Sequence, residues 1–369
     1  MPEGSRRRKK RPHISVGVEL ETYSIAMPEN RICRELHFPK RSAVEKGERF
    51  IRDWSIGSEY NSKVFTRIRE AFFLLKTGLR KYSMFKQDDG GKRKHIIFPI
   101  GGWSDRFAGT HIHISLGRNG ISYEDASALA GYLHGHIPFI IAIAANSPVW
   151  RRQITGFASN RLLKGSDKYC KITKNGILPK ARFREITYNK PHAKKPPTLE
   201  LRVCDSALPE YIVAALCVVN AVALRWLRKK PPLNQSTAPN YLKARDQAIR
   251  YGVDAKLVWS DHWITVPQYT DLFFRKYKDE LEAIDIPDEI VRIFKYLKRG
   301  VNQATVIRDT VTRCKRVSGK MWQKQFAKRY VSAIERLLDG DSFEKFTRDL
   351  GVKLPYIERS WLGYDWARW

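Results

Sequence analysis

The chain has 369 residues, of which 43% are hydrophobic and 12% aromatic, so it is long and apolar enough for one or two folded domains and is not a disordered chain. It contains no run of about 18 uncharged apolar residues and no apolar segment behind its basic N-terminus, so we expect neither a membrane-spanning helix nor a secretory signal. The five cysteines are scattered without a C-x-x-C pair, which argues against a disulfide framework or zinc knuckle and favours a reducing, cytoplasmic location.

The net charge of +30 indicates an acidic partner, such as nucleic acid, an anionic surface or an acidic polypeptide. A general effect on solubility would explain the same excess of lysine and arginine. The sequence lacks the Walker phosphate loop and the G-x-G-x-x-G pattern, so a bound nucleotide would need another kind of site.

Along the chain, the sequence predicts a tail, a mixed region and a helical region. Residues 1–12 contain the unbroken basic run Arg6–Arg11 and are expected to be disordered. Residues 13–230 alternate between predicted strands and apolar helices. A polar linker then leads into residues 231–369, which we expect to be mainly helical and basic and to pack on or follow the first region.

Three helices are expected in the mixed region. Arg67–Lys81 has apolar residues at helical spacing. A second helix begins at Ser122, continues to about residue 146 and should be divided by Pro138. A third begins at Pro209 and is apolar. Between these elements, Gln87–Lys94 is rich in Asp, Gly and Lys and is predicted to be a loop.

Four segments alternate between apolar and polar residues, which is typical of strands with one polar face. They are His13–Tyr23, Arg52–Tyr60, His111–Leu116 and Thr198–Cys204. One such strand alone is usually an ordinary solvated strand. Here the polar positions carry carboxylates and histidines although lysine and arginine dominate the chain, and this favours a shared site.

If the four strands form one sheet, its polar face gathers groups that suit a divalent cation and a phosphate. Carboxylate oxygens and an imidazole are acceptable ligands for Mg²⁺ or Mn²⁺, and an arginine beside two such ions suits a triphosphate. The second H-x-H pair, His134 and His136, falls in a predicted helix, where residues two apart do not share a face, so we expect it to be structural.

These strands carry a family resemblance. Gly17–Glu21, Asp53–Glu59, Gly109–Leu116 and Pro197–Asp205 resemble the catalytic strands of the carboxylate–amine ligases, which include glutamine synthetase, the type-2 glutamate–cysteine ligases and the amidoligases. Two further stretches fit the same resemblance: the pair Ala145–Trp150 and Thr155–Arg161 is similar to the "NSP…TG.AS.R" pattern of type-2 glutamate–cysteine ligases, and Arg184–Asn189 resembles a short amidoligase motif.

The resemblance implies an α+β fold of the glutamine synthetase type. Its catalytic domain would cover residues 13–230, with a curved, mainly antiparallel sheet that has one polar catalytic face and helices on the other face. The implied reaction joins a small-molecule or peptide carboxylate to an amine. It would use ATP and two or more Mg²⁺ or Mn²⁺ ions, pass through an acyl phosphate, and form an amide such as a γ-glutamyl bond while releasing ADP and phosphate.

The resemblance also implies roles for individual residues. One metal, at the nucleotide phosphates, would be held by Glu19, His111 and Glu200. A second, nearer the acceptor carboxylate, would be held by Glu21 and Glu59 with Asp53. The nucleotide would contact His113 and Ser115, Arg202 would stabilise the transferring phosphoryl group, and Arg161 or Arg152 would bind the substrate or phosphate. Beside this site, the loop with Lys190, His192, Lys194 and Lys195 would close over it, bind an acidic substrate or stay solvated.

Other function classes would use the same residues. A metal-dependent phosphoesterase would use the acidic sheet without ATP, with the basic surface binding a phosphate backbone. A nucleic-acid-binding protein would use the basic surface alone. The acidic and E-x-R strands favour the ligase over both.

Overall fold

The structure is a computed structural model that describes residues 13–33, 39, 41–53, 55–83, 94–173, 177–178, 183–192 and 195–358. The expected basic tail, nearly all of the expected loop Gln87–Lys94, and Lys194 lie outside these ranges.

An eight-stranded sheet forms the base of the fold, and its described pairings are all antiparallel. The strand order is β3-β4-β1-β6-β10-β9, and β2 and β5 pair with the second half of the long β1. This confirms the expected α+β class with a mainly antiparallel sheet. The strands are β1 (Ile14–Met27), β2 (Arg31–Cys33), β3 (Arg49–Asp53), β4 (Gly57–Asn61), β5 (Lys94–Phe98), β6 (Gly109–Leu116), β9 (Ile186–Asn189) and β10 (Thr198–Asp205).

The expectation of a single strand over Arg52–Tyr60 is wrong, because this segment is the turn of the β3–β4 hairpin. Asp53 pairs with Gly57 across it. The Asp53 carboxylate accepts hydrogen bonds from the backbone N–H groups of Ser55 and Ile56, both at 2.8 Å, and Gly57 has φ +114°. An Asp that bonds the backbone two residues on and a glycine with positive φ are turn signals, and here they override the alternation.

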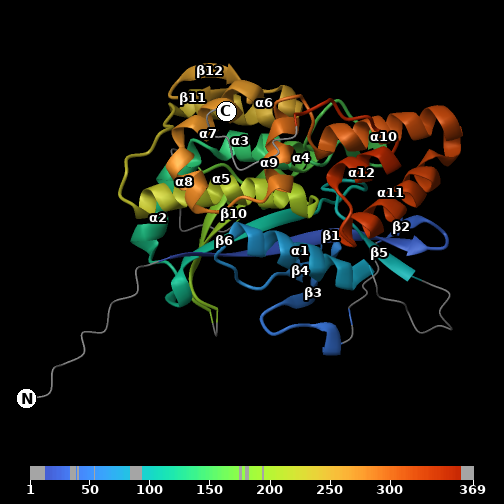
Figure 1. Cartoon of the computed structure of the whole chain (residues 1–369), viewed down its shortest axis with the longest axis horizontal. Coiled ribbons are helices and arrows are strands. Elements are labelled where there is room, and N and C mark those ends of the chain that lie inside the picture. Colours follow the sequence, from blue (N-terminus) through green and yellow to red (C-terminus); the bar gives the residue numbers. More distant parts are fainter. Residues whose placement is uncertain are drawn as a thin grey trace, which may run out of the picture.

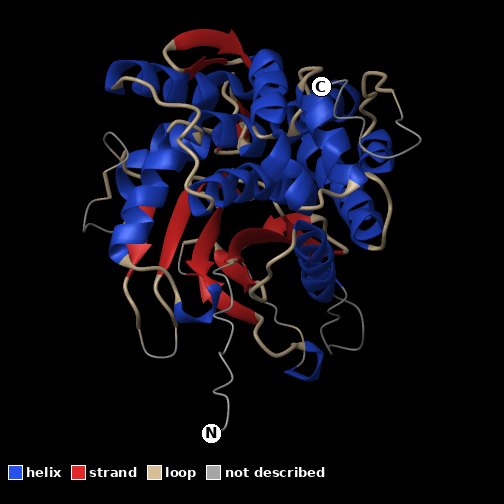
Figure 2. Cartoon of the chain, turned by 60° about the vertical axis from the view of Figure 1, so that its left-hand side comes forward, coloured by secondary structure: helices blue, strands red, loops and turns tan. Residues whose placement is uncertain are grey.

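Helices cover the apolar face of the sheet and leave the polar face open (Figures 1 and 2). Against the sheet lie α1 (Ile68–Ser83), α2 (Tyr123–His134), α3 (Ile137–Ala144), α4 (Asn160–Tyr169) and α5 (Pro209–Leu227). Ser122 caps α2 by accepting from the Asp125 N–H at 3.0 Å, and Pro138 lies in the first turn of α3, so the predicted long helix is divided as expected.

The central helix α5 is long and apolar enough to cross a membrane by length and composition alone. In this fold it is a core helix, because nearly all its side chains up to Ala223 are buried. It packs against α1, α2, α3, α8 and α9.

The C-terminal region is mainly helical, as expected, and shares one continuous core with the sheet. Its helices are α6 (Ala238–Tyr251), α7 (Val266–Lys276), α8 (Lys278–Ala283), α9 (Asp288–Leu297), α10 (Gln303–Ser318), α11 (Trp322–Leu338) and α12 (Phe343–Asp349). A small hairpin of β11 (Lys256–Trp259) and β12 (His262–Thr265) was not anticipated. Short 3₁₀ turns lie at Arg41–Ala43, Gly117–Asn119, Gly252–Asp254 and Gly319–Met321.

His134 and His136 are structural, as predicted. The His136 ring is fully buried, and its two nitrogens lie 2.8 Å and 2.9 Å from the hydroxyls of Tyr269 and Tyr277. The His134 ring stacks on Tyr241. Burial lowers the pKa of His136 to about 3, so it stays neutral.

Candidate active site

Cross-strand pairing places the predicted acidic residues and histidines side by side. Residues directly opposite in an antiparallel sheet project from the same face. The three opposite pairs are Glu21 with Glu59, Glu19 with His111, and His113 with Glu200. The site therefore spans four neighbouring strands, β4, β1, β6 and β10, on the open face of the sheet.

The first cluster consists of Glu19, His113 and Glu200, whose ligand atoms lie within 4.8 Å of one another. His113, which the resemblance assigned to the nucleotide, is thus among the candidate metal ligands, with Nε2 3.3 Å from Glu19. His111 is adjacent, because its Nδ1 lies 3.6 Å from Glu19 and 3.5 Å from Glu200. Both histidines of the motif therefore border one carboxylate pair.

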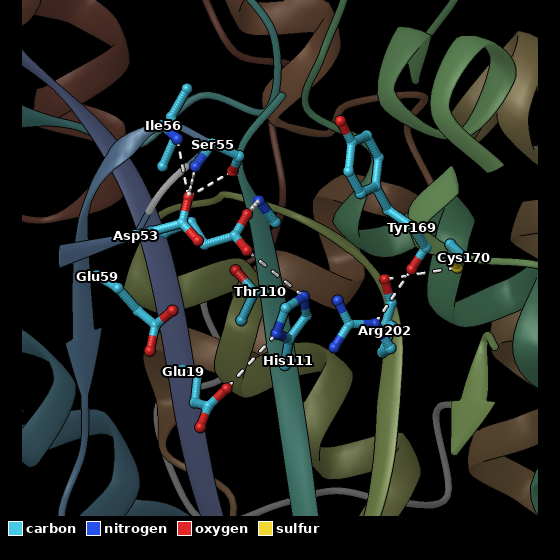
Figure 3. Close-up of polar contacts among 12 residues, drawn as sticks. Glu19, Asp53, Ser55, Ile56, Glu59, Thr110, His111, Tyr169, Cys170 and Arg202 are labelled. Carbon is cyan, nitrogen blue, oxygen red and sulfur yellow. Dashed lines mark hydrogen bonds and ion pairs between the residues drawn. The ribbon is translucent and has the colours of Figure 1, made fainter. Parts of the chain in front are cut away.

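The second cluster consists of Glu21, Asp53 and Glu59, again with ligand atoms within 4.8 Å of one another. Glu21 accepts a hydrogen bond from the Gly109 N–H at 2.6 Å, and the β3–β4 turn fixes Asp53. The sequence-based set of three carboxylates is therefore brought together by the fold. Figure 3 shows Asp53 and Glu59 on one side of His111 and Arg202 on the other.

His111 lies between the two clusters. Its Nδ1 faces Glu19 and Glu200, whereas its Nε2 lies 3.8 Å from Glu21. The side chain is buried, and Nε2 has no hydrogen-bond partner among the described residues. A buried nitrogen without a partner beside carboxylates is what a metal-binding or ligand-binding group requires.

The two clusters differ in charge state. Burial raises the pKa of Glu59 to about 8, and the charges of Glu19, Glu21 and Asp53 add to this effect. Burial also disfavours ionised Glu19, but its pKa lies well below the ordinary value because the imidazoles of His111 and His113 outweigh burial. In the second cluster, Glu59 therefore keeps its proton up to about pH 8, whereas Glu19 in the first cluster is ionised.

These donors fit hard divalent cations. Each cluster offers carboxylate oxygens, and the first adds one imidazole, a set acceptable to Mg²⁺ or Mn²⁺. The raised pKa of Glu59 and the unpartnered Nε2 of His111 are both features that a bound cation between the strands would relieve.

The Arg202 side chain lies beside the first cluster, at a point where the pairing of β10 with β6 is irregular. The pairing register with β6 shifts between Leu201 and Cys204, and the Arg202 N–H donates to the Glu185 carbonyl at 3.0 Å instead. The guanidinium pairs with Glu200 and donates from Nε to the Tyr169 carbonyl at 3.1 Å. Although burial opposes ionisation of Glu200, Arg202 holds its carboxyl pKa below the usual value.

The Arg161 side chain contacts the backbone of the site strands and not the two carboxylate clusters. Its side chain is buried and donates from Nη2 to the Arg202 carbonyl at 3.0 Å, with Nη1 3.9 Å from buried Asp205. It also packs against Gly109 so closely that a Cβ there would lie 2.3 Å from Nη2. Arg161 thus contacts the backbone of two site strands, which differs from the expected grip on substrate.

The other residues of the motif that contains Arg161 also form contacts within the fold. The Asp205 carboxylate accepts from the Asn146 N–H at 2.8 Å and from the hydroxyls of Ser147 and Ser159 at 2.7 Å and 3.0 Å. Four residues of the "NSP…AS.R" pattern therefore meet at one buried carboxylate.

Two other predicted residues lie apart from the clusters. Arg152 is exposed in the turn between β7 (Val149–Trp150) and β8 (Gln153–Ile154). Ser115 is buried near the end of β6, with its hydroxyl 3.3 Å from that of Ser15. Within the described ranges, no hydrogen bond or ion pair joins either side chain to a cluster carboxylate.

Sequence reasoning gave no role to Asn189 or Thr198, which hold the first cluster from its outer side. Asn189 donates to Glu200 at 2.8 Å, and the Thr198 hydroxyl lies 3.1 Å from His113 Nδ1. Asn189 and Thr198 are opposite each other in the β9–β10 pair, a register that alternation alone does not reveal. Of the basic loop, Lys190, His192 and Lys195 are exposed beside them.

Comparison with known proteins supports the same class. Residues 101–181 match the family model of glutamate–cysteine ligase family 2. A protein named "Putative glutamate–cysteine ligase 2" from Methylibium petroleiphilum is 30% identical over 171 residues, covering 41% of this chain and 44% of the relative. Its namesake from an Enterobacter species is 26% identical, covering 55% of this chain and 59% of the relative. The chain spans about half the length of the curated relatives that it matches.

Solved structures share the fold at low sequence identity. The ligase PafA, in a complex with the prokaryotic ubiquitin-like protein Pup, superposes with a TM-score of 0.57 at 12% identity, covering 92% of this chain and 80% of that chain. Glutamate–cysteine ligase from Francisella tularensis, in complex with AMP, superposes with a TM-score of 0.53 at 13% identity and covers 93% of both chains. The fold is therefore that of the glutamine synthetase-like carboxylate–amine ligases.

Proposed function

We propose that this chain, which resembles the carboxylate–amine ligases in fold and motifs, is an ATP-dependent ligase that joins a carboxylate to an amine. The observation that carries the proposal is the pair of clusters on one sheet face, with His111 between them and Arg202 at the edge. The substrates would be a small-molecule or peptide carboxylate and an amine, with ADP and phosphate as products.

Two divalent cations fit the site, one at Glu19, His113 and Glu200 and one at Glu21, Asp53 and Glu59. When bound, such ions neutralise the repulsion between a carboxylate and a triphosphate and favour in-line transfer to an acyl phosphate. ATP use is supported by the AMP complex of the Francisella glutamate–cysteine ligase and by an ADP complex of PafA.

The chain's own residues orient and stabilise the reacting groups. The Arg202 guanidinium is fixed on one side by Glu200 and on the other by the Tyr169 carbonyl, so its remaining donors are preorganised for a phosphoryl oxygen. His111 lies between the clusters with Nδ1 facing Glu19 and Glu200, so its unpartnered Nε2 is directed toward the Glu21 side. Asn189 keeps the Glu200 carboxylate turned toward the cluster.

The test is ADP release from Mg²⁺-ATP over a panel of amino acids, amines and acidic peptides, with mass spectrometry of the products. Glu19→Gln removes one cluster charge, and Arg202→Ala removes the guanidinium. Glu124→Gln and Arg299→Ala are matched controls, because both residues are exposed and lie outside the clusters.

We expect ADP release that depends on both substrates, falls by at least about 100-fold in the two site variants and is unchanged in the controls. An amide product with ADP would identify the substrates. Metal-dependent cleavage of a phosphoester without ATP, lost in the same variants, would instead support the phosphoesterase alternative and overturn the ligase proposal.

A further inference from the structure

The turn between β7 and β8 contains two arginines in a backbone conformation that arginine rarely adopts. Trp150 pairs with Gln153, so Arg151 and Arg152 form a two-residue hairpin loop. Their φ angles are +47° and +60°. Positive φ at both central positions is the pattern of a type I′ turn, which strongly favours Asn-Gly. Two arginines in a turn that favours other residues indicate that their side chains function in binding.

Aromatic and basic side chains surround this turn. The Arg151 guanidinium lies 4.5 Å and the Lys164 ammonium 5.4 Å from the Trp150 ring centre. Lys168 follows Lys164 by one helical turn on α4 and is exposed, and the adjacent Tyr169 side chain is 41% exposed. We call these residues the rim patch: Trp150, Arg151, Arg152, Lys164, Lys168 and Tyr169.

The cations of the rim patch are available for a ligand. Within the part of the chain that the structure describes, Arg151, Arg152, Lys164 and Lys168 form no ion pair. Asp105 and Asp167 are exposed nearby, and exposed Asp246 on the adjacent α6 pairs with Arg250. The patch borders the active site, because the Tyr169 carbonyl binds Arg202, and both Tyr169 and Arg202 appear in Figure 3.

A second basic segment is joined to the rim patch through the buried rings of Trp103 and Trp322. The Arg152 N–H donates to the Trp103 carbonyl at 2.8 Å, and the Trp103 ring packs 5.5 Å from that of Trp322 at the start of α11. Lys315 lies 5.1 Å from the Trp322 ring centre. Contacts therefore link the turn to the end of the α10–α11 hairpin, at the right of Figure 1.

This helical end is basic and partly apolar. Arg316 and Lys320 are exposed beside Lys315, and none of the three forms an ion pair with another described residue. Val317 and Met321 expose 69% and 60% of their surface between these cations. We call this segment, residues 315–321, the basic tip.

We infer that the rim patch and the basic tip together form a binding track for single-stranded nucleic acid, a role separate from the proposed ligase reaction. Arginine forks match phosphate oxygens. Tyr169 in the rim patch and Val317 and Met321 in the basic tip expose surface on which unpaired bases can stack. The net charge of +30 suits a polyanion, and the exposed Tyr169 ring favours one with bases over an acidic polypeptide. The clusters' carboxylates would repel the strand and keep it along the rim.

The test uses fluorescence anisotropy of the full chain with a labelled oligothymidylate, without ATP or metal, at several salt concentrations. The informative variant is Arg151→Asn with Arg152→Gly, because it removes two cations and installs the residues that a type I′ turn favours. Its melting temperature should rise, so weaker binding cannot be attributed to unfolding. Arg275→Gln with Lys276→Gln, exposed on α7 away from the track, is the charge-matched control.

We expect the turn variant to bind at least about tenfold more weakly and to lower the log–log salt slope by about 1.4, the value for two phosphate contacts on a single strand. The control should match wild type, and a duplex of the same length should bind more weakly than the single strand. Equal losses in the turn variant and the control would overturn the track. So would a preference for polyglutamate over the oligothymidylate, which would identify an acidic polypeptide as the ligand. ADP release is not part of this assay, so its failure leaves the ligase proposal unaffected.

Discussion

Glu21 and Glu59 lie directly opposite each other in the antiparallel β1–β4 pair. Like charges in that arrangement destabilise a sheet, and here both side chains are also buried. Ionising both members of the pair is therefore unfavourable, and the pKa of Glu59 is raised by its burial first and then by the charges of Glu19, Glu21 and Asp53.

The contribution of Glu59 to stability without divalent metal should fall as pH rises from about 5 to 8. The folded chain keeps a proton on Glu59 up to a pKa of about 8, whereas the unfolded chain loses it near 4.5. The folded state thus binds more protons in this window, and the free energy of unfolding decreases by roughly 3 to 5 kcal/mol across it. Compared with wild type in EDTA, urea denaturation should show a flatter pH dependence for Glu59→Gln in EDTA and for wild type with Mg²⁺ in place of EDTA. Glu124→Gln is the control. If Glu59→Gln shows the same pH dependence of unfolding free energy as wild type and this control, Glu59 is not the group that binds the proton.

Arg202→Lys should lose most activity even though it keeps the charge. Lysine cannot pair with Glu200, donate to the Tyr169 carbonyl and still present a second fork to a phosphoryl oxygen. We expect kcat to fall by at least about 100-fold with little change in KM for ATP, since the loss is in the transition state. Steady-state ADP release measures both, with Arg299→Lys as the control. A variant with unchanged kcat would remove Arg202 from the chemistry.

The polar face of the sheet could be predicted from local alternation, whereas the fold class followed from the family resemblance that the same strands carry. Glu19, Glu21, His111, His113 and Glu200 fall on one face in their own strands, so burying the apolar side places them all on the open face. The register of the pairing then brings them together. Alternation does not reveal which residues lie opposite each other in the sheet. The sequence therefore did not predict that Asn189 pairs with Thr198, or that Asp53 and Glu59 lie on two strands of a hairpin.

Arg161 was misjudged for a related reason. The motif indicates that Arg161 is important for the site. It does not show whether the side chain contacts the substrate or supports the backbone of the strands that form the site. That difference rests on burial and on long-range contacts with Arg202, Asp205 and Gly109, none of which alternation or spacing encodes.

Removing the Arg161 charge should destabilise the protein more than removing the Arg161–Asp205 pair. Arg161→Met leaves Asp205 buried without its cation, and an unpaired buried charge costs about 3 to 5 kcal/mol. Adding Asp205→Asn to that variant should recover a substantial part of the loss. Urea denaturation of the two single variants and the double variant measures this coupling. Strict additivity would mean that the two side chains do not interact.

His136 should make the protein sensitive to acid. Its folded pKa of about 3 lies below the unfolded value of 6.5, so between these pH values the unfolded chain binds a proton that the folded chain does not. Stability should therefore fall as pH drops below 6.5, by up to about 1.4 kcal/mol per pH unit from this group. His136→Gln should reduce that slope, at a cost of about 1 to 3 kcal/mol at neutral pH from the tyrosine hydrogen bonds. Exposed His262→Gln is the control, and an unchanged slope in His136→Gln would contradict the assignment.

Asn189→Ala should weaken activation by metal without removing a charge. Asn189 donates to Glu200 and lies 3.4 Å from His113 Nδ1, so it orients two of the three side chains in the first cluster. Groups that orient ligands from outside typically contribute 10- to 100-fold to metal affinity. The Mn²⁺ concentration for half-maximal ADP release should therefore rise by about that factor, while activity at saturating Mn²⁺ recovers. Asn240→Ala, which removes an exposed amide bonded to Asp261, should leave the titration unchanged. Loss of activity at every Mn²⁺ concentration would instead mean that Asn189 contacts the substrate or maintains the β9–β10 pair, and the orienting role would be wrong.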